Sequence, residues 1–284
     1  MELPELECSA LSHVGPVRED NQDAFFLPQP QMAQEKGYLF ALADGMGGDA
    51  NGALASKLAL EALTDEFYGR NGTPGQVSLR KGVENANLKI FKVAQQLGSG
   101  HMGTTLTAAF ICGSNLFLAH VGDSRAYLVR GLKGSVLTND HTTVGDLVRM
   151  RVISPEKVRD HPNRSILTRT VGMTLFVNPE FSRFSLREGD RLVLCSDGLW
   201  SVIEDSEMAD LSAAAPTADA LCHSLIELAL ERETDDNVSV VAIFARRLLQ
   251  PGAAVVEGLA RRWTAPFRKL IPAFVHKNGT EKAC

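Results

Sequence analysis

The sequence predicts an α+β fold in which antiparallel β-strands carry a layer of helices. Two observations support this prediction. Apolar stretches of strand length follow one another through short turns, and the two longest stretches with helical spacing, 53–68 and 76–97, are neighbours in the chain. Strands joined by short turns pair in the antiparallel sense, and two helices that enter together cover one face of a sheet.

Each predicted strand is a short apolar or alternating run bounded by turn residues. Strands are expected at 6–12, 20–27, 37–43, 104–112, 115–121, 125–130, 191–196 and 237–244. Helices are expected at 53–68, 76–97, 142–150 and 218–232. In the first of these helices the apolar residues at near-helical spacing are Leu54, Leu58, Ala62 and Phe67.

One stretch, 101–122, contains no Asp, Glu, Lys or Arg and is long enough to raise the question of a membrane span. Gly113, Ser114 and Asn115 divide it into halves rich in Thr, Phe and alternating side chains. Two strands joined by a turn account for this pattern better than a membrane-spanning helix does.

The composition is that of an ordinary globular protein, with 44% hydrophobic and 22% charged residues in a chain of 284. The five cysteines form no C-x-x-C pair and have no regular spacing, so neither a zinc site nor a disulfide framework is expected. The start of the chain has no basic segment followed by an apolar core, so no signal peptide is expected. The cysteine pattern predicts a reducing compartment.

Charge divides the chain into two parts. Segment 246–284 carries eight Lys or Arg and two Glu, a net charge of +6. Because the whole chain has a net charge of −5, residues 1–245 carry a net charge of −11. An acidic core with a basic tail is unlike a nucleic-acid-binding domain. We therefore expect one domain over 1–245, with a polar, Arg-rich flap at 138–172. The amphipathic tail is expected either to be loosely ordered or folded onto the core, or to contact a membrane surface or a partner.

The stretch 38–63, YLFALADGMGGDANGALASKLALEAL, places Asp44 where an apolar strand ends, followed by three glycines and a helix. It has three interpretations. Asp-Gly is a common turn pair. Glycines before a helix can hold a phosphate. Alternatively, Asp44 ligates a metal, and the glycines let the backbone approach it. This stretch alone does not decide among them.

Other acids repeat this placement beside apolar runs. Asp123 follows a strand after Gly122, Asp197 follows the strand Leu192–Cys195, and Asp236 precedes a strand. Asp23 lies in GPVREDNQDAF near the start. Buried carboxylates without partners are costly, and several that converge repel one another unless a cation lies between them. Only the fold could bring such distant residues together.

The residue types favour a hard cation. No Cys or His stands at ligand spacing among these motifs, which disfavours zinc and copper. Carboxylates, a carbonyl and waters suit Mg²⁺ or Mn²⁺. Two such ions about 3.5–4 Å apart would activate a water for displacement at phosphorus. Arg18 is the best-placed arginine to bind phosphate oxygens, and the alternative is an ordinary surface arginine.

These motifs resemble the metal-dependent serine/threonine protein phosphatases of the PPM (protein phosphatase 2C) type, in their bacterial form. The similarity covers about 8–245. In order, the motifs are VREDNQDAF, ALADGMGG, GTTLTAAF, HVGDSRAYLV, LTNDHT, HPNRSILTRTVG, LVLCSDGLW and DDNVSVVAIF. The resemblance implies a sandwich of two antiparallel sheets flanked by paired helices, in αββα layers, with a mobile flap beside the metal cleft.

The resemblance also implies roles for individual residues. Asp44 would bridge two Mn²⁺ or Mg²⁺ ions, with the Gly45 carbonyl on one of them. Asp197 and Asp236 would complete the shell of the opposite ion. Asp123, together with Asp197, would hold a weaker third metal.

Three further roles and two departures complete the comparison with the family. Asp23 would hold metal-bound waters, Arg18 would bind substrate phosphate, and Asn237 would stiffen its loop. Eukaryotic members have a histidine, taken to be the proton donor, where this chain has Met46; no residue is assigned that role here. Gln22 stands where many members have Glu.

The function implied is hydrolysis of phosphoserine and phosphothreonine in proteins, reversing bacterial Ser/Thr kinase signalling. A phosphorylated protein, together with its cognate kinase, is the expected partner, and the enzyme is expected to be monomeric. The alternative from another class is a catalytically silent phosphatase-like module that binds phosphoproteins. A nucleotide-binding domain is disfavoured because DGMGGDANG does not fit G-x-G-x-x-G.

Overall fold

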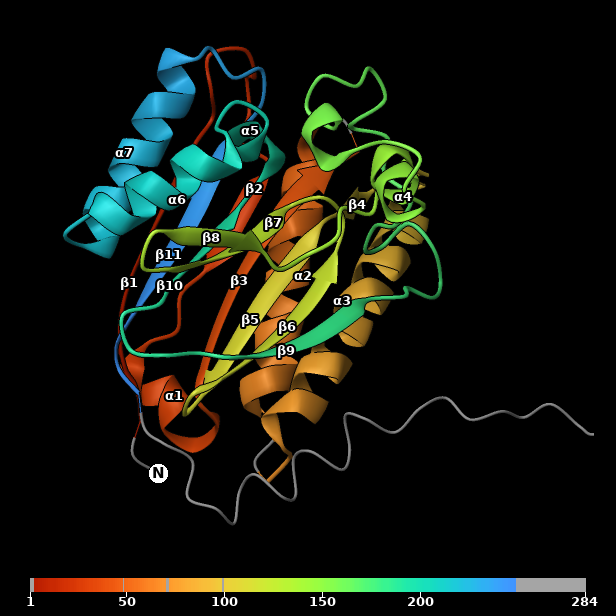
Figure 1. Ribbon diagram of the computed structural model, residues 1–284. Helices are drawn as coiled ribbons and strands as arrows, with labels where there is room; N and C mark the ends of the chain where they lie inside the picture. Colours follow the sequence, from red (N-terminus) through yellow and green to blue (C-terminus); the bar gives the residue numbers. More distant parts are fainter. Residues whose placement is uncertain (1–2, 48, 70–71, 99, 249–284) are drawn as a thin grey trace, which may run out of the picture. The chain divides into compact units, whose positions relative to one another are not determined.

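The computed structural model describes residues 3–47, 49–69, 72–98 and 100–248, and there two antiparallel β-sheets pack face to face (Figure 1). The first sheet has the order β1 (Glu5–His13), β11 (Val238–Arg247), β10 (Arg191–Cys195), β7 (Arg125–Arg130), β8 (Lys133–Val136). The second has the order β2 (Asp23–Phe26), β3 (Tyr38–Met46), β5 (Leu106–Cys112), β6 (Asn115–Val121), β9 (Glu180–Ser185), and β4 (Gly103–Thr104) pairs with β3.

Helices cover the outer face of each sheet. The long pair α2 (Asp49–Gly69) and α3 (Gly75–Leu97) packs on the second sheet, and α6 (Asp205–Ala214) and α7 (Ala218–Glu231) pack on the first (Figure 1). The shorter helices are α1 (Pro30–Lys36), α4 (Thr143–Arg149), α5 (Asp197–Trp200) and the 3₁₀ turn η1 (Pro155–Lys157). This arrangement confirms the predicted αββα layers.

Strand β11 shows why the central strands read as continuous apolar runs. Val240, Ala242 and Phe244 belong to the core between the first sheet and its helices. Val241 and Ile243 alternate with them and belong to the core between the two sheets. A strand buried on both faces needs apolar residues at every position, so it loses the alternation of a half-buried strand.

Helix α2 buries small residues together with large apolar ones on its inner face. Leu54 is 38% exposed, whereas Ala55, Ala59 and Leu63 are fully buried. Small residues on the inner face let the helix lie close to β3, with which it is in contact. The helix that the spacing of Leu54 and Phe67 predicted is present, and of these two residues only Phe67 is buried.

The uncharged stretch forms the hairpin β5–β6, with Gly113 at φ 59° in its two-residue turn. Within the described residues, no helix combines the length and apolarity needed to cross a membrane, and the cysteines there are free thiols. Strand β11 continues to Arg247, and the rest of the predicted tail, 249–284, lies outside the described residues.

Candidate metal centre

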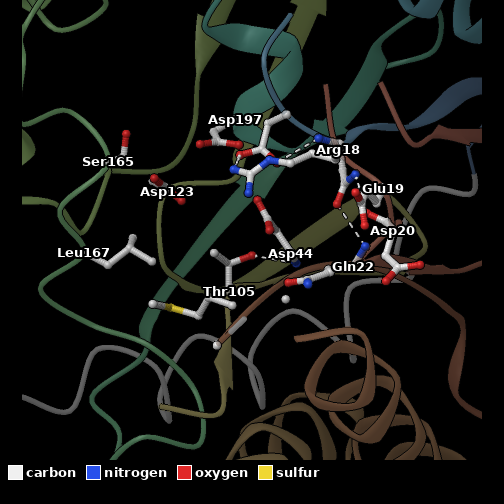
Figure 2. A pocket seen from close by; sticks show the side chains of 15 residues that line it. Arg18, Glu19, Asp20, Gln22, Asp44, Thr105, Asp123, Ser165, Leu167 and Asp197 are labelled. Atoms are coloured by element: carbon white, nitrogen blue, oxygen red, sulfur yellow. Dashed lines mark hydrogen bonds and ion pairs between the residues drawn. The ribbon is translucent and has the colours of Figure 1, made fainter. Parts of the chain in front are cut away.

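At one end of the sandwich, a cleft of about 380 Å³ collects side chains from distant parts of the sequence (Figure 2). Its lining includes Asp44 from β3, Asp123 from the β6–β7 loop, Asp197 from the start of α5 and Asp236 from the approach to β11. Arg18 lies at its edge. Asp23 lies beneath this lining and is 9% exposed.

Asp44 lies within a strand and not, as the sequence indicated, at the end of one. Strand β3 continues to Met46 because Gly45 pairs with Thr104 of β4. The main-chain N–H of Asp44 donates to Thr105 Oγ1 at 2.9 Å, and its carbonyl oxygen accepts from Thr105 N–H at 2.8 Å. With its backbone fixed on both sides, Asp44 directs its carboxylate into the cleft (Figure 2).

Two of the glycines after Asp44 have a steric explanation. A Cβ on Gly45 would lie 2.1 Å from the carbonyl oxygen of Gly52, so glycine lets the first turn of α2 approach the strand. Gly47 has φ +138°, and a Cβ there would lie 2.1 Å from the carbonyl oxygen of His101. The tight turn predicted from the sequence is present at Gly47, and Gly48 lies outside the described residues.

Two buried carboxylate oxygens in this region have no hydrogen-bond partner. Asp23 stands opposite Asp44 in the β2–β3 pairing, and its Oδ2 accepts from Ser196 Oγ at 2.9 Å. Its Oδ1 is buried without a partner, as is Oδ1 of Asp197. Orphaned buried oxygens are expensive, and a bound cation or its water ligands would satisfy them.

The acids also raise one another's pKa values. Burial, with the charges of neighbouring carboxylates, raises the pKa of Asp23 to about 6 and that of Asp197 to about 7. The same two causes raise the pKa values of Asp44 and Asp123 well above the usual range for aspartate. Such a cluster retains protons at neutral pH unless a cation replaces them.

The carboxylates of the cleft suit a hard cation that keeps several of its water ligands. In the part of the chain that the structure describes, no three Asp, Glu, His or Cys side chains converge closely enough to hold an ion alone. Mg²⁺ and similar ions need fewer, because they keep several waters and take one or two carboxylates. The carboxylates in the lining and the orphaned oxygens match that mode of binding.

Asn237 connects the loop that carries Arg18 to the start of β11. Its Oδ1 accepts from the N–H of Gln22 at 2.9 Å, and its Nδ2 donates to the carbonyls of Val14 and Asp20 at 2.8 and 2.9 Å. These three hydrogen bonds restrain the loop, as was expected of the Asn237 amide. The loop is thereby placed beside the metal centre.

The loop places Arg18 beside an acid of the cleft. Arg18 Nη2 donates to Asp236 Oδ2 at 2.7 Å, and 54% of the arginine side chain remains exposed. The guanidinium is therefore accessible from solvent at the mouth of the cleft. An exposed ion pair of this kind is weak enough to exchange partners.

Part of the lining was not predicted. Asp20, which stands with Arg18 and Asp23 in the motif GPVREDNQDAF, lines the cleft as an acid of that motif, but Glu19, Thr105 and the flap residues Ser165 and Leu167 were not singled out. Glu19 lies directly beside Arg18 in the same motif, so the sequence did contain a signal for it. No local signal distinguishes Ser165 and Leu167 from the rest of their polar segment.

Metal-free protein is expected to lose stability as the pH rises. The folded pKa values of Asp23 and Asp197, about 6 and about 7, exceed the ordinary value of 3.8. Between about pH 4 and pH 7 the unfolded chain therefore binds fewer protons than the folded one, and the free energy of unfolding falls.

Thermal unfolding midpoints at pH 5 and pH 7.5, with and without Mn²⁺, test this linkage. Mn²⁺ replaces the protons, so it should raise the midpoint more at pH 7.5. Greater stabilisation by Mn²⁺ at pH 5 would contradict the clustering of acids described above.

Comparisons with known proteins agree with this geometry. The family model described as "Protein phosphatase 2C" matches residues 9–238. Serine/threonine protein phosphatase PstP of Mycobacterium tuberculosis is 37% identical over 237 residues, which are 83% of this chain and 44% of PstP. Protein phosphatase PhpP of Streptococcus pneumoniae is 33% identical over 242 residues, 84% of this chain and 97% of PhpP.

Solved structures extend the similarity to three dimensions. A crystal structure of the PstP catalytic domain in complex with two manganese ions has a TM-score of 0.73 and 34% identity, covering 86% of this chain and 99% of that one. This chain spans under half the length of the whole PstP protein, 44%, and nearly all of PhpP, 97%. On the family match and these identities, the chain belongs to the protein phosphatase 2C family.

Proposed function

We propose that the chain is a metal-dependent protein phosphatase that hydrolyses phosphoserine and phosphothreonine in proteins. The observation that carries the proposal is the cleft itself. Asp44, Asp123, Asp197 and Asp236, from four separate parts of the chain, line one hollow beside the exposed guanidinium of Arg18. Of the relatives named above, PstP is named a serine/threonine protein phosphatase and PhpP a protein phosphatase.

The residues that would hold the metal are those of the cleft floor. Asp44 would bridge two Mn²⁺ or Mg²⁺ ions, the Gly45 carbonyl would contact one, and Asp197 and Asp236 would hold the other. Asp123 would hold a weaker third ion with Asp197. When bound, the ions supply positive charge and an activated water for displacement at phosphorus.

Other side chains around the cleft would orient water and bind the substrate phosphate. Asp23, buried under the lining, would orient water by hydrogen bonds. Arg18 would move from Asp236 to the substrate and bind two phosphate oxygens, a geometry for which guanidinium is well suited. Met46 lines the cleft and has no proton to donate, so the leaving oxygen must receive its proton from another group.

Replacement of the arginine is expected to separate binding from chemistry. Arg18→Ala should raise KM for a phosphopeptide by about tenfold and lower kcat much less, because it removes contacts made in both ground and transition states. Steady-state kinetics at saturating Mn²⁺ measure both constants. An unchanged KM would show that Arg18 does not bind the substrate phosphate.

Hydrolysis of p-nitrophenyl phosphate and of a phosphothreonine peptide, with Mn²⁺ and then with excess chelator, tests the function. We expect turnover that the chelator abolishes and added Mn²⁺ restores. Turnover that ignores the chelator would remove the metal mechanism. Phosphopeptide binding without any turnover would support the silent binding module instead.

The proposal extends to the cellular setting. We propose that the enzyme acts in the cytoplasm as a monomer on proteins phosphorylated by a cognate Ser/Thr kinase. The basic tail, 246–284, would contact a membrane surface or a protein partner. A comparison of the phosphoproteome in cells with and without the protein would identify the substrates.

A further inference from the structure

Trp200 contacts two of the acidic segments of the metal centre. It is the last residue of α5, the short helix that begins with Asp197. Its indole Nε1–H donates to the main-chain carbonyl of Asp123 at 2.9 Å, and the residue is 1% exposed. A single rigid side chain therefore connects the helix that carries Asp197 to Asp123 itself.

Arg125 of β7 fixes the indole ring from one side. Its guanidinium carbon lies 3.7 Å from the centroid of the Trp200 ring, within cation–π range. The same guanidinium forms a two-point ion pair with Asp140, Nε–Oδ1 3.0 Å and Nη2–Oδ2 2.7 Å. Both charged side chains are 8% exposed. A buried, doubly bonded pair leaves the ring little freedom to move.

Arg159, from the segment between β8 and β9, holds the backbone of Trp200. Arg159 Nε donates to the Trp200 carbonyl at 2.8 Å, and Nη2 donates to the carbonyl of Ile203 at 3.1 Å. The same Nη2 donates to Asp205 Oδ1 at 2.6 Å. The C-terminal end of α5 is thus tied to the predicted flap.

A role in core packing alone would explain the ring of Trp200 but not its N–H. A phenylalanine would also place an aromatic ring against Arg125, although a smaller one, and it would leave the Asp123 carbonyl without this donor. The hydrogen bond instead links two chain segments whose carboxylates line one cleft. Their relative placement decides whether a single ion can contact both.

We propose that Trp200 is a positioning residue: held between Arg125 and Arg159, its indole N–H fixes Asp123 relative to Asp197 and sets the affinity of these two acids for Mn²⁺. The inference rests on the proposed function, because it takes both acids as metal ligands. Groups that orient metal ligands from outside change metal affinity by about 10- to 100-fold when they are lost.

Trp200→Phe tests the proposal, with Tyr68→Phe as the matched control. The control also removes one polar atom that bonds the main chain, since Tyr68 Oη accepts from Leu39 N–H at 3.0 Å, far along β3 from the cleft. Mn²⁺ binding to chelator-treated protein is measured by calorimetry, beside unfolding midpoints in metal-free buffer. We expect the weakest Mn²⁺ site to lose about tenfold in affinity in Trp200→Phe and to be unchanged in Tyr68→Phe.

A double-mutant cycle separates positioning from general loosening. In an Asp123→Asn background, Trp200→Phe should change the remaining Mn²⁺ affinities less than twofold, because the residue it acts through is already altered. Arg125→Lys keeps the charge but loses the planar stack, and should reproduce the loss if Trp200→Phe fails to fold.

Three outcomes would count against the proposal. Equal Mn²⁺ affinity in wild type and Trp200→Phe would overturn it and leave the proposed function intact. A loss that persists undiminished in the Asp123→Asn background would also overturn it, since Trp200 would then act by another route. Wild-type protein that binds no Mn²⁺ and hydrolyses no phosphate ester would overturn the proposed function as well.

Discussion

Asp44→Asn is expected to lower kcat for p-nitrophenyl phosphate by at least about a thousandfold at saturating Mn²⁺. The carboxylate extends from a strand whose backbone is fixed by Thr105 and faces the other acids of the cleft. An amide of the same shape keeps the packing but loses the negative charge that would hold two ions. The loss of activity is therefore expected to come from weaker metal binding and a slower chemical step, and not from disrupted packing.

The same variant is expected to remain folded. Burial and the neighbouring carboxylates raise the pKa of Asp44, which means that its ionised form is unfavourable in the metal-free fold. A neutral amide removes this repulsion, so the metal-free unfolding midpoint should be unchanged or a few degrees higher. Asp210→Asn, on the exposed side of α6, is a control that should change neither quantity. Wild-type turnover in Asp44→Asn would refute the bridging role.

Asn237→Ala is expected to have the largest effect on stability, a loss of about 3 kcal/mol in the free energy of unfolding. The side-chain amide satisfies the carbonyls of Val14 and Asp20 and the N–H of Gln22, and Asn237 is 5% exposed. Alanine leaves these three backbone groups without that partner, and each buried unsatisfied group is destabilising.

Activity should fall with stability, because the same loop carries Arg18. Misplacing a binding group by about 1 Å can lower kcat/KM about a hundredfold. Denaturant unfolding and phosphopeptide kinetics measure the two effects. Asn139→Ala is the control: Asn139 is exposed, its amide contacts the partly buried Glu180, and a loss under about 1 kcal/mol is expected. A similarly small loss in Asn237→Ala would show that the loop is held by other contacts.

Local sequence predicted the elements whose pattern is set by their own burial. Strands β6 and β7 coincide with the predicted ranges 115–121 and 125–130. An apolar run of this length bounded by turn residues has few alternative structures. Helix α6 was missed, since its residues are mostly polar or small. Its only local signal is the capping box of Glu204 and Glu207. Edge strand β9 has no buried face to give an alternating pattern.

Long-range pairing explains the remaining differences. Strand β3 extends past Ala43 because β4 pairs with Gly45 and Met46. No local sequence pattern predicts this pairing. The acids at the cleft were proposed from their placement beside apolar runs and from the family resemblance. The contacts of Asn237 and Trp200 connect residues far apart in sequence, so only the fold could supply them.

A crystal structure of the protein grown with Mn²⁺, with an anomalous difference map recorded at the manganese edge, tests the central claim most directly. The account predicts two strong anomalous peaks in the cleft, both in contact with the carboxylate of Asp44, one of them shared with Asp197 and Asp236. A cleft without manganese, or ions bound only at other surfaces while these three carboxylates remain apart, would contradict it.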